Sequence, residues 1–85
     1  MDILNNDEVE FLRKELSISE KDLASMTEER WKRIRSACFD IEADELLTLS
    51  EQGYDIDEYA TERSEIAGSI ASIKYADLLA KGIAV

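Results

Sequence analysis

The apolar residues of this chain recur at the three- and four-residue spacing of amphipathic helices, and no segment shows the alternation typical of strands. In residues 28–52 one helical face carries Trp31, Ile34, Cys38, Ile41 and Leu49, with Phe39 and Leu46 at its margin. In residues 56–81 an isoleucine stripe runs beside an alanine–serine stripe. The first consists of Tyr59, Ile66, Ile70 and Ile73, and the second of Ala60, Ser64, Ala67 and Ala71.

Four helix starts share one pattern, in which a capping residue stands between two apolar residues that pack on each other. The four caps are Asn5, Ser19, Thr27 and Asp55. An acid occupies the third helical position after every cap except Thr27, where Arg30 stands instead. These signals predict helices at 6–16, 20–25, 28–52 and 56–81. Gly53 and Gly82 stand where the last two helices are expected to end.

The pattern predicts an all-α fold in a single domain, residues 1–85. The two long helices, joined by a short turn at Gly53, are expected to form an antiparallel hairpin, with the shorter N-terminal helical pair packed on it. That pair has too few apolar residues to cover both stripes of the last helix, which Leu78 extends. Because monomers rarely expose such a strip, we expect a homodimer in which two hairpins form a four-helix core.

The net charge of −10, from 20 acids and 10 bases, changes the expected partners. Residues 40–65 hold ten of the acids and one base, a local charge of −9. Such a surface repels nucleic acid and anionic membranes and favours a basic protein partner. Its candidate contact residues are Asp40, Asp44, Glu51, Asp55, Asp57, Glu58 and Glu62. They either keep a small protein soluble or imitate a nucleic-acid backbone and occupy a basic groove.

Residues 27–39 have the opposite charge and suggest an alternative. The first three helices resemble a helix-turn-helix, in which Arg30, Lys32 and Arg33 would contact DNA while the C-terminal helices dimerise. Glu28 and Glu29 count against it, because they occupy the leading end of that helix, where phosphates must approach. Trp31 between these bases is either a binding hot spot or the apolar partner of Met26 at the helix start.

The residue types leave little room for catalysis. The chain has no histidine, one cysteine and no glycine-rich phosphate loop, so we expect no enzymatic activity, no catalytic residue, no metal and no cofactor. Glu42 and Glu45 are the remaining candidates, as a buried carboxylate pair that binds a metal or transfers protons. The alternative is that they pair with Arg35, Arg63 or Lys74. Cys38, in the apolar face, is expected to be a buried and inert thiol.

The location expected from the sequence is the cytoplasm. The first residues, MDILNNDEVE, lack the basic start and apolar run of a signal peptide, and no apolar stretch is long enough to span a membrane. A single cysteine suits a reducing compartment, because it forms no internal disulfide.

Three blocks of sequence carry a resemblance to a known group. CFDIEADE at 38–45, TERSEIAGSIASI at 61–73 and ISEKDLASMTEERW at 18–31 resemble segments of small acidic proteins from prophages and mobile elements of Gram-positive bacteria, over about residues 16–75. The resemblance implies that the protein is encoded by a prophage or another mobile element, and it assigns no functional residues. Small proteins encoded by such elements include inhibitors of host defence nucleases (anti-CRISPR-like proteins), antitoxins and regulators.

Together these observations suggest a non-enzymatic acidic module that blocks a basic, nucleic-acid-handling host protein. The alternatives are the helix-turn-helix regulator described above and a structural or assembly component of a phage.

Overall fold

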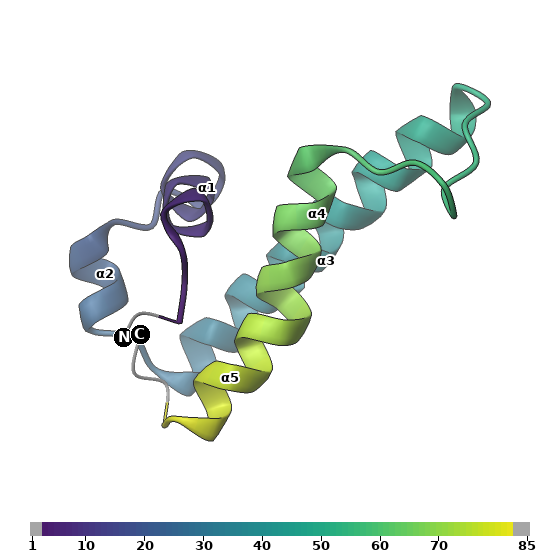
Figure 1. Ribbon diagram of the computed structural model, residues 1–85. Coiled ribbons are helices and arrows are strands. Elements are labelled where there is room, and N and C mark those ends of the chain that lie inside the picture. Colours follow the sequence, from purple (N-terminus) through teal and green to yellow (C-terminus); the bar gives the residue numbers. More distant parts are fainter. Residues whose placement is uncertain (1–2, 83–85) are drawn as a thin grey trace.

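Six helical segments make up the regular structure of residues 3–82, the part of the chain that the computed structural model describes. They are α1 (Asn6–Leu16), α2 (Glu20–Ala24), α3 (Glu28–Glu51), α4 (Glu62–Ser69), the π-helical segment η1 (Ile70–Lys74) and α5 (Tyr75–Ala80). The last three follow one another without a break and form one continuous helix (Figure 1). No strand occurs among these residues, which confirms the all-α class.

Local capping explains why the first three helices begin where the sequence predicts. The side chain of Asn5 accepts from the N–H of Glu8 at 2.8 Å, and the Glu8 carboxylate accepts from the N–H of Asn5 at 2.9 Å. Ser19 and Asp22 form the same reciprocal pair. Thr27 accepts from the N–H of Arg30 at 3.2 Å. Each bond satisfies an N–H that has no partner inside its own helix.

The predicted start of the last helix at residue 56 is wrong, because α4 begins at Glu62 with Thr61 as its cap. The pattern around Asp55 forms a single turn, in which the N–H of Tyr59 donates to the carbonyl of Asp55 at 2.9 Å. An isolated turn does not propagate unless packing of an apolar face supports it. Here Ile56 and Tyr59 stay exposed. The last helix is therefore shorter than α3, and a loop of residues 52–61 joins the two helices instead of the predicted short turn at Gly53.

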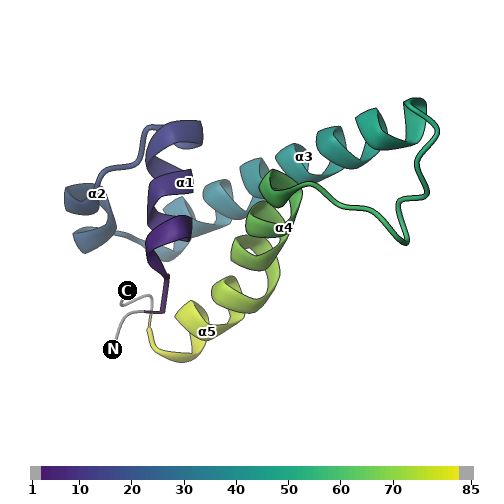
Figure 2. The same cartoon turned by 45° about the horizontal axis from the view of Figure 1, so that its top comes forward.

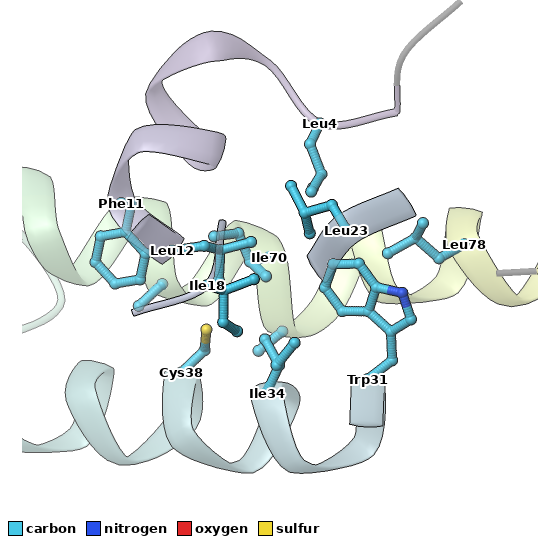
Figure 3. Close-up of a cluster of buried hydrophobic side chains, with 12 residues drawn as sticks. Leu4, Phe11, Leu12, Ile18, Leu23, Trp31, Ile34, Cys38, Ile70 and Leu78 are labelled. Atoms are coloured by element: carbon cyan, nitrogen blue, oxygen red, sulfur yellow. The ribbon is translucent and has the colours of Figure 1, made fainter. Parts of the chain in front are cut away.

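The core lies where the N-terminal helices meet the longer ones. α3 and the α4–η1–α5 helix lie side by side and run in opposite directions, with α1 and α2 across one end (Figures 1 and 2). Trp31, Ile34 and Cys38 of the predicted α3 face are buried there, beneath side chains from α1 and α2 (Figure 3). The complete set of buried apolar residues is Leu4, Phe11, Leu12, Ile18, Leu23, Trp31, Ile34, Cys38, Ala67, Ile70, Ala71 and Leu78.

The alanine–serine stripe of the last helix is largely buried within one chain, whereas the isoleucine stripe is buried only in part. Ala67 and Ala71 of the small-residue stripe are buried, and so are Ile70 and Leu78. The long uncovered strip on which the homodimer was predicted is thus absent from the part of the chain that the structure describes. Among the large apolar residues of η1 and α5, Ile73 and Leu79 alone remain exposed, with exposed fractions of 64% and 42%. The homodimer itself stays a prediction.

The opposite end of the molecule has no core of its own. Every residue between Cys38 and Ser64 is exposed or half-buried. We call residues 40–62 the arm; it comprises the second half of α3 and the loop that leads to α4. Figures 1 and 2 show its far end extending away from α1 and α2. The arm makes the molecule elongated, with principal extents of 41 × 24 × 22 Å.

Candidate functional site

All seven acids predicted to contact a partner lie in the arm and are exposed. Asp40, Asp44 and Glu51 project from α3 at spacings of four and seven residues, which places them along one side of the helix. Asp55, Asp57 and Glu58 belong to the loop, and Glu62 is the first residue of α4. The fold therefore gathers on one projection a set of carboxylates that spans 23 positions of the sequence, 40 to 62.

These seven carboxylates are not neutralised within residues 3–82, where none of them forms an ion pair. Acids elsewhere behave differently: Glu10 pairs with Arg13, and Glu15 lies 2.6 Å from Arg63. The arm itself contains nine acids and no lysine or arginine. The charge of the seven exposed acids thus faces solvent and is available to an external cation.

Backbone hydrogen bonds shape the loop at the end of the arm. Gly53 ends α3 in a left-handed conformation, with φ of 90°. The Asp55 carboxylate accepts from the N–H of Asp57 at 2.9 Å, and its carbonyl accepts from the N–H groups of Glu58 and Tyr59. The rings of Tyr54 and Tyr59 meet edge to face, with centroids 5.3 Å apart. The loop consequently has a defined shape although it buries nothing.

Large apolar side chains are interspersed among the acids of the arm. Tyr54, Ile56 and Tyr59 have exposed fractions of 50%, 47% and 52%, and Leu47 of α3 has 58%. No local signal in YDIDEY, residues 54–59, reveals their exposure, because apolar residues in a helical pattern normally face a core. These four are most of the large exposed apolar residues in the described chain.

The predicted DNA-binding residues lie near the start of α3, at the other end of the molecule. Arg30 is half-buried and lies 4.0 Å from Asp22, and Arg33 lies 3.7 Å from Glu29. Lys32 is exposed. Their neighbour Arg35 packs between the rings of Phe39 and Tyr75, at 4.9 and 5.0 Å, and donates to the carbonyl of Ala71. Arg30 and Arg33 thus have acidic neighbours, and Arg35 serves the fold.

Two residues with alternative roles are buried. Trp31 has an exposed fraction of 1%, so the hot-spot interpretation is wrong and the packing interpretation holds. Its indole N–H has no hydrogen-bond partner among residues 3–82. Cys38 is fully buried, and desolvation raises the pKa of its thiol to about 12. The thiolate, which is the reactive form, is therefore scarce at neutral pH, as expected for an inert cysteine.

The carboxylates of Glu42 and Glu45 serve packing and ion pairing. Glu45 pairs at 3.0 Å with Arg63, which is one of its predicted partners. Arg63 also binds Glu15, so it links α4 to both α3 and α1, and these two carboxylates raise its pKa. Glu42 lies against Gly68, where a Cβ atom would come within 2.1 Å of its Oε2. No group of three metal-binding side chains forms among residues 3–82.

A buried polar cluster around Glu8 went unrecognised in the sequence. Besides capping α1, Glu8 accepts from the hydroxyl of Ser69 at 3.1 Å and lies 3.4 Å from Nζ of Lys74. Lys74 in turn donates to the carbonyl of Ile3 at 2.7 Å. The available signal was spacing, since Glu8 shares a helical face with Phe11 and Leu12. The cluster fastens the N-terminal segment to η1.

A groove of about 540 Å³ lies between α1 and the beginning of α4. Phe11 and Ile66 supply its apolar lining. Its two cations, Lys14 and Arg63, pair with Glu10 and Glu15 of the same rim. The groove therefore offers no free cation to an anionic ligand.

Among residues 3–82 no helix is both long enough and apolar enough to cross a bilayer. Comparison of the chain with protein-family models, with curated protein sequences and with solved structures found no match.

Proposed function

We propose that this protein is a non-enzymatic binding module whose acidic arm occupies a basic surface on a protein partner. The observation that carries the proposal is the exposure of seven unneutralised carboxylates on one projection that has no fully buried residue. Charge that serves only solubility has no need to be concentrated, whereas an electrostatic binding surface must be. The concentration of charge at one end therefore supports recognition.

The proposed partner handles nucleic acid, and the proposed role is to block it. A groove that binds nucleic acid is basic, and rows of carboxylates on a helix present it with regularly placed negative charge. Asp40 and Asp44 follow each other by about 6 Å along the axis of α3. The resemblance to small acidic proteins of prophages and mobile elements supports the same role, as an inhibitor of a host defence nuclease or as an antitoxin.

The test is affinity capture from cells that naturally express the protein, with three versions of the chain as bait. The wild type is compared with an arm variant, Asp55→Asn, Asp57→Asn, Glu58→Gln, and with a control variant, Glu20→Gln, Glu28→Gln, Glu65→Gln. Both variants lose three exposed charges, and only the first loses them from the loop. The Asp55→Asn substitution keeps the side-chain oxygen that accepts from the N–H of residue 57.

We expect the wild type and the control to retain a basic nucleic-acid-binding protein that the arm variant fails to retain. Raising the salt concentration should release it, because screening weakens such contacts. Equal retention of the same proteins by all three baits, or a captured partner that is not basic, would sink the proposal.

A further inference from the structure

The exposed apolar side chains of the loop have no explanation in the fold. Tyr54, Ile56 and Tyr59 contribute nothing to the buried core, and each has about half of its surface in water. The two tyrosines contact each other. Clustered exposed apolar surface within a polar rim is characteristic of interaction sites, and tyrosine is enriched among residues that dominate binding energy.

Resting on the proposed function, we infer that Tyr54, Ile56 and Tyr59 form the anchor of the arm and insert into an apolar cleft of the partner, while the acids between them pair with a basic rim. The partner is thus a protein with an apolar cleft surrounded by lysine or arginine. A uniformly basic groove does not fit this surface.

Charge selects this occupant over the others. Asp55, Asp57 and Glu58 lie between the anchor residues, so whatever covers the anchor must also approach three carboxylates. A second copy of the arm brings nine acids and no base to the contact, and a nucleic acid brings phosphates. Both are repelled. A protein with cations around an apolar cleft can contact both the apolar anchor residues and the acids between them.

The loop is also organised before it binds. The N–H groups of residues 57, 58 and 59 donate to oxygen atoms of Asp55, and these bonds, together with the tyrosine contact, hold the anchor side chains on one short turn. Preorganisation lowers the entropy lost on binding, and a few rigid aromatic side chains then supply most of the affinity. The acids mainly accelerate and orient the encounter.

A random peptide library displayed on phage tests the anchor on the intact chain. Selected peptides are synthesised and titrated by fluorescence anisotropy against the wild type, Tyr54→Ser, Ile56→Ser and the double control Ile73→Ser, Leu79→Ser. Ile56→Ser leaves the tyrosine contact in place. The control removes exposed apolar side chains outside the arm. For each peptide, a version with its apolar residues replaced by serine keeps its charge.

We expect selected peptides to combine basic and apolar residues. Tyr54→Ser and Ile56→Ser should each weaken binding by about tenfold or more, as removal of a hot-spot residue does. The control should bind like the wild type, and the serine peptides should bind weakly to every version.

Two different failures are distinguishable. If basic peptides bind in a salt-sensitive manner but tolerate both arm substitutions, the anchor is wrong and the acidic module stands. If the library yields no basic peptide, the anchor and the proposed function fail together.

Discussion

At the scale of single residues, the most consequential side chain is the buried carboxylate of Glu8. It is almost completely inaccessible, yet donors surround it: the N–H of Asn5, the hydroxyl of Ser69 and the ammonium of Lys74. A buried charge is tolerated only when it is compensated in this way. Glu8 thereby unites helix capping, the N-terminal segment and η1 in one cluster.

Glu8→Gln should lower the free energy of unfolding by about 1–3 kcal/mol, because it removes the charge that Lys74 and Ser69 face and leaves hydrogen bonds to a neutral group. Urea unfolding monitored by circular dichroism measures the change. Glu10→Gln is the matched control, since Glu10 caps nothing and is exposed on the same helix. Equal urea midpoints for the two variants would show that the Glu8 cluster contributes nothing to the free energy of unfolding.

Asp22 gives a pH-dependent prediction. Its carboxylate accepts from the backbone N–H and the hydroxyl of Ser19, and these bonds hold its pKa below 3.8. Because the folded-state pKa is depressed, the contribution of Asp22 to stability is complete above pH 3.8 and is lost as the pH falls through the lower folded-state value. An NMR titration of the Asp22 carboxyl should have its midpoint below 3.8. Ser19→Ala removes the hydroxyl bond and keeps the backbone bond, so it should move the midpoint upward. An unchanged midpoint would show that the hydroxyl does not lower the pKa of Asp22.

At the scale of elements, α3 is divided between two environments. Its first half contributes Trp31, Ile34 and Cys38 to the core, whereas beyond Cys38 it has no buried residue. Helical segments that bury little surface open more readily, because fewer packing contacts add to the hydrogen bonds that hold them. The two halves of one continuous helix should therefore differ in local stability.

Hydrogen exchange measures this difference directly. We expect backbone amides of residues 43–51 to exchange markedly faster than those of residues 32–42, although all belong to α3. Residues 62–69 of α4, which pack against α3 and α1, should resemble the protected half. Uniform protection along α3 would mean that the arm is stabilised by contacts other than burial.

The same division explains how far the sequence predicts the fold. Capping bonds join residues three positions apart, so Asn5, Ser19 and Thr27 were recognisable in the sequence. At Asp55 the same signal produced one turn, because continuation depends on burial against distant residues. The π-helical segment was equally hidden: a 3.6-residue period places Ile73 with Ile70, but wider turns leave Ile73 exposed and bring Lys74 to Glu8.

The candidate site was predictable in part for a related reason. Exposure of the seven acids follows from their chemistry, since charged side chains rarely lose solvent without a partner. The exposure of Tyr54, Ile56 and Tyr59 does not follow from their chemistry, because apolar residues in a helical pattern normally face a core. Whether these three residues are exposed depends on where α4 begins. The capping pattern at Asp55 predicted that start at residue 56, whereas α4 begins at Glu62.

At the scale of the whole molecule, the predicted homodimer now depends on Ile73 and Leu79, the exposed large apolar residues of the η1 and α5 segments. Sedimentation equilibrium at micromolar concentration should then give a mass above the 9.6 kDa of one chain, increasing with salt because screening reduces repulsion between chains of charge −10. Ile73→Lys should restore the single-chain mass, whereas Tyr54→Ser should not. A 9.6 kDa species at low and high salt would exclude the dimer.

The absence of buried residues between Cys38 and Ser64 has an evolutionary consequence. Most substitutions destabilise a protein through its core, so residues that take no part in the core can change with little loss of folded protein. In this chain the residues that hold the fold and the residues proposed to meet a partner are largely different sets. An arm of this kind can diversify quickly when a partner mutates to escape it, while the helices that carry it stay the same.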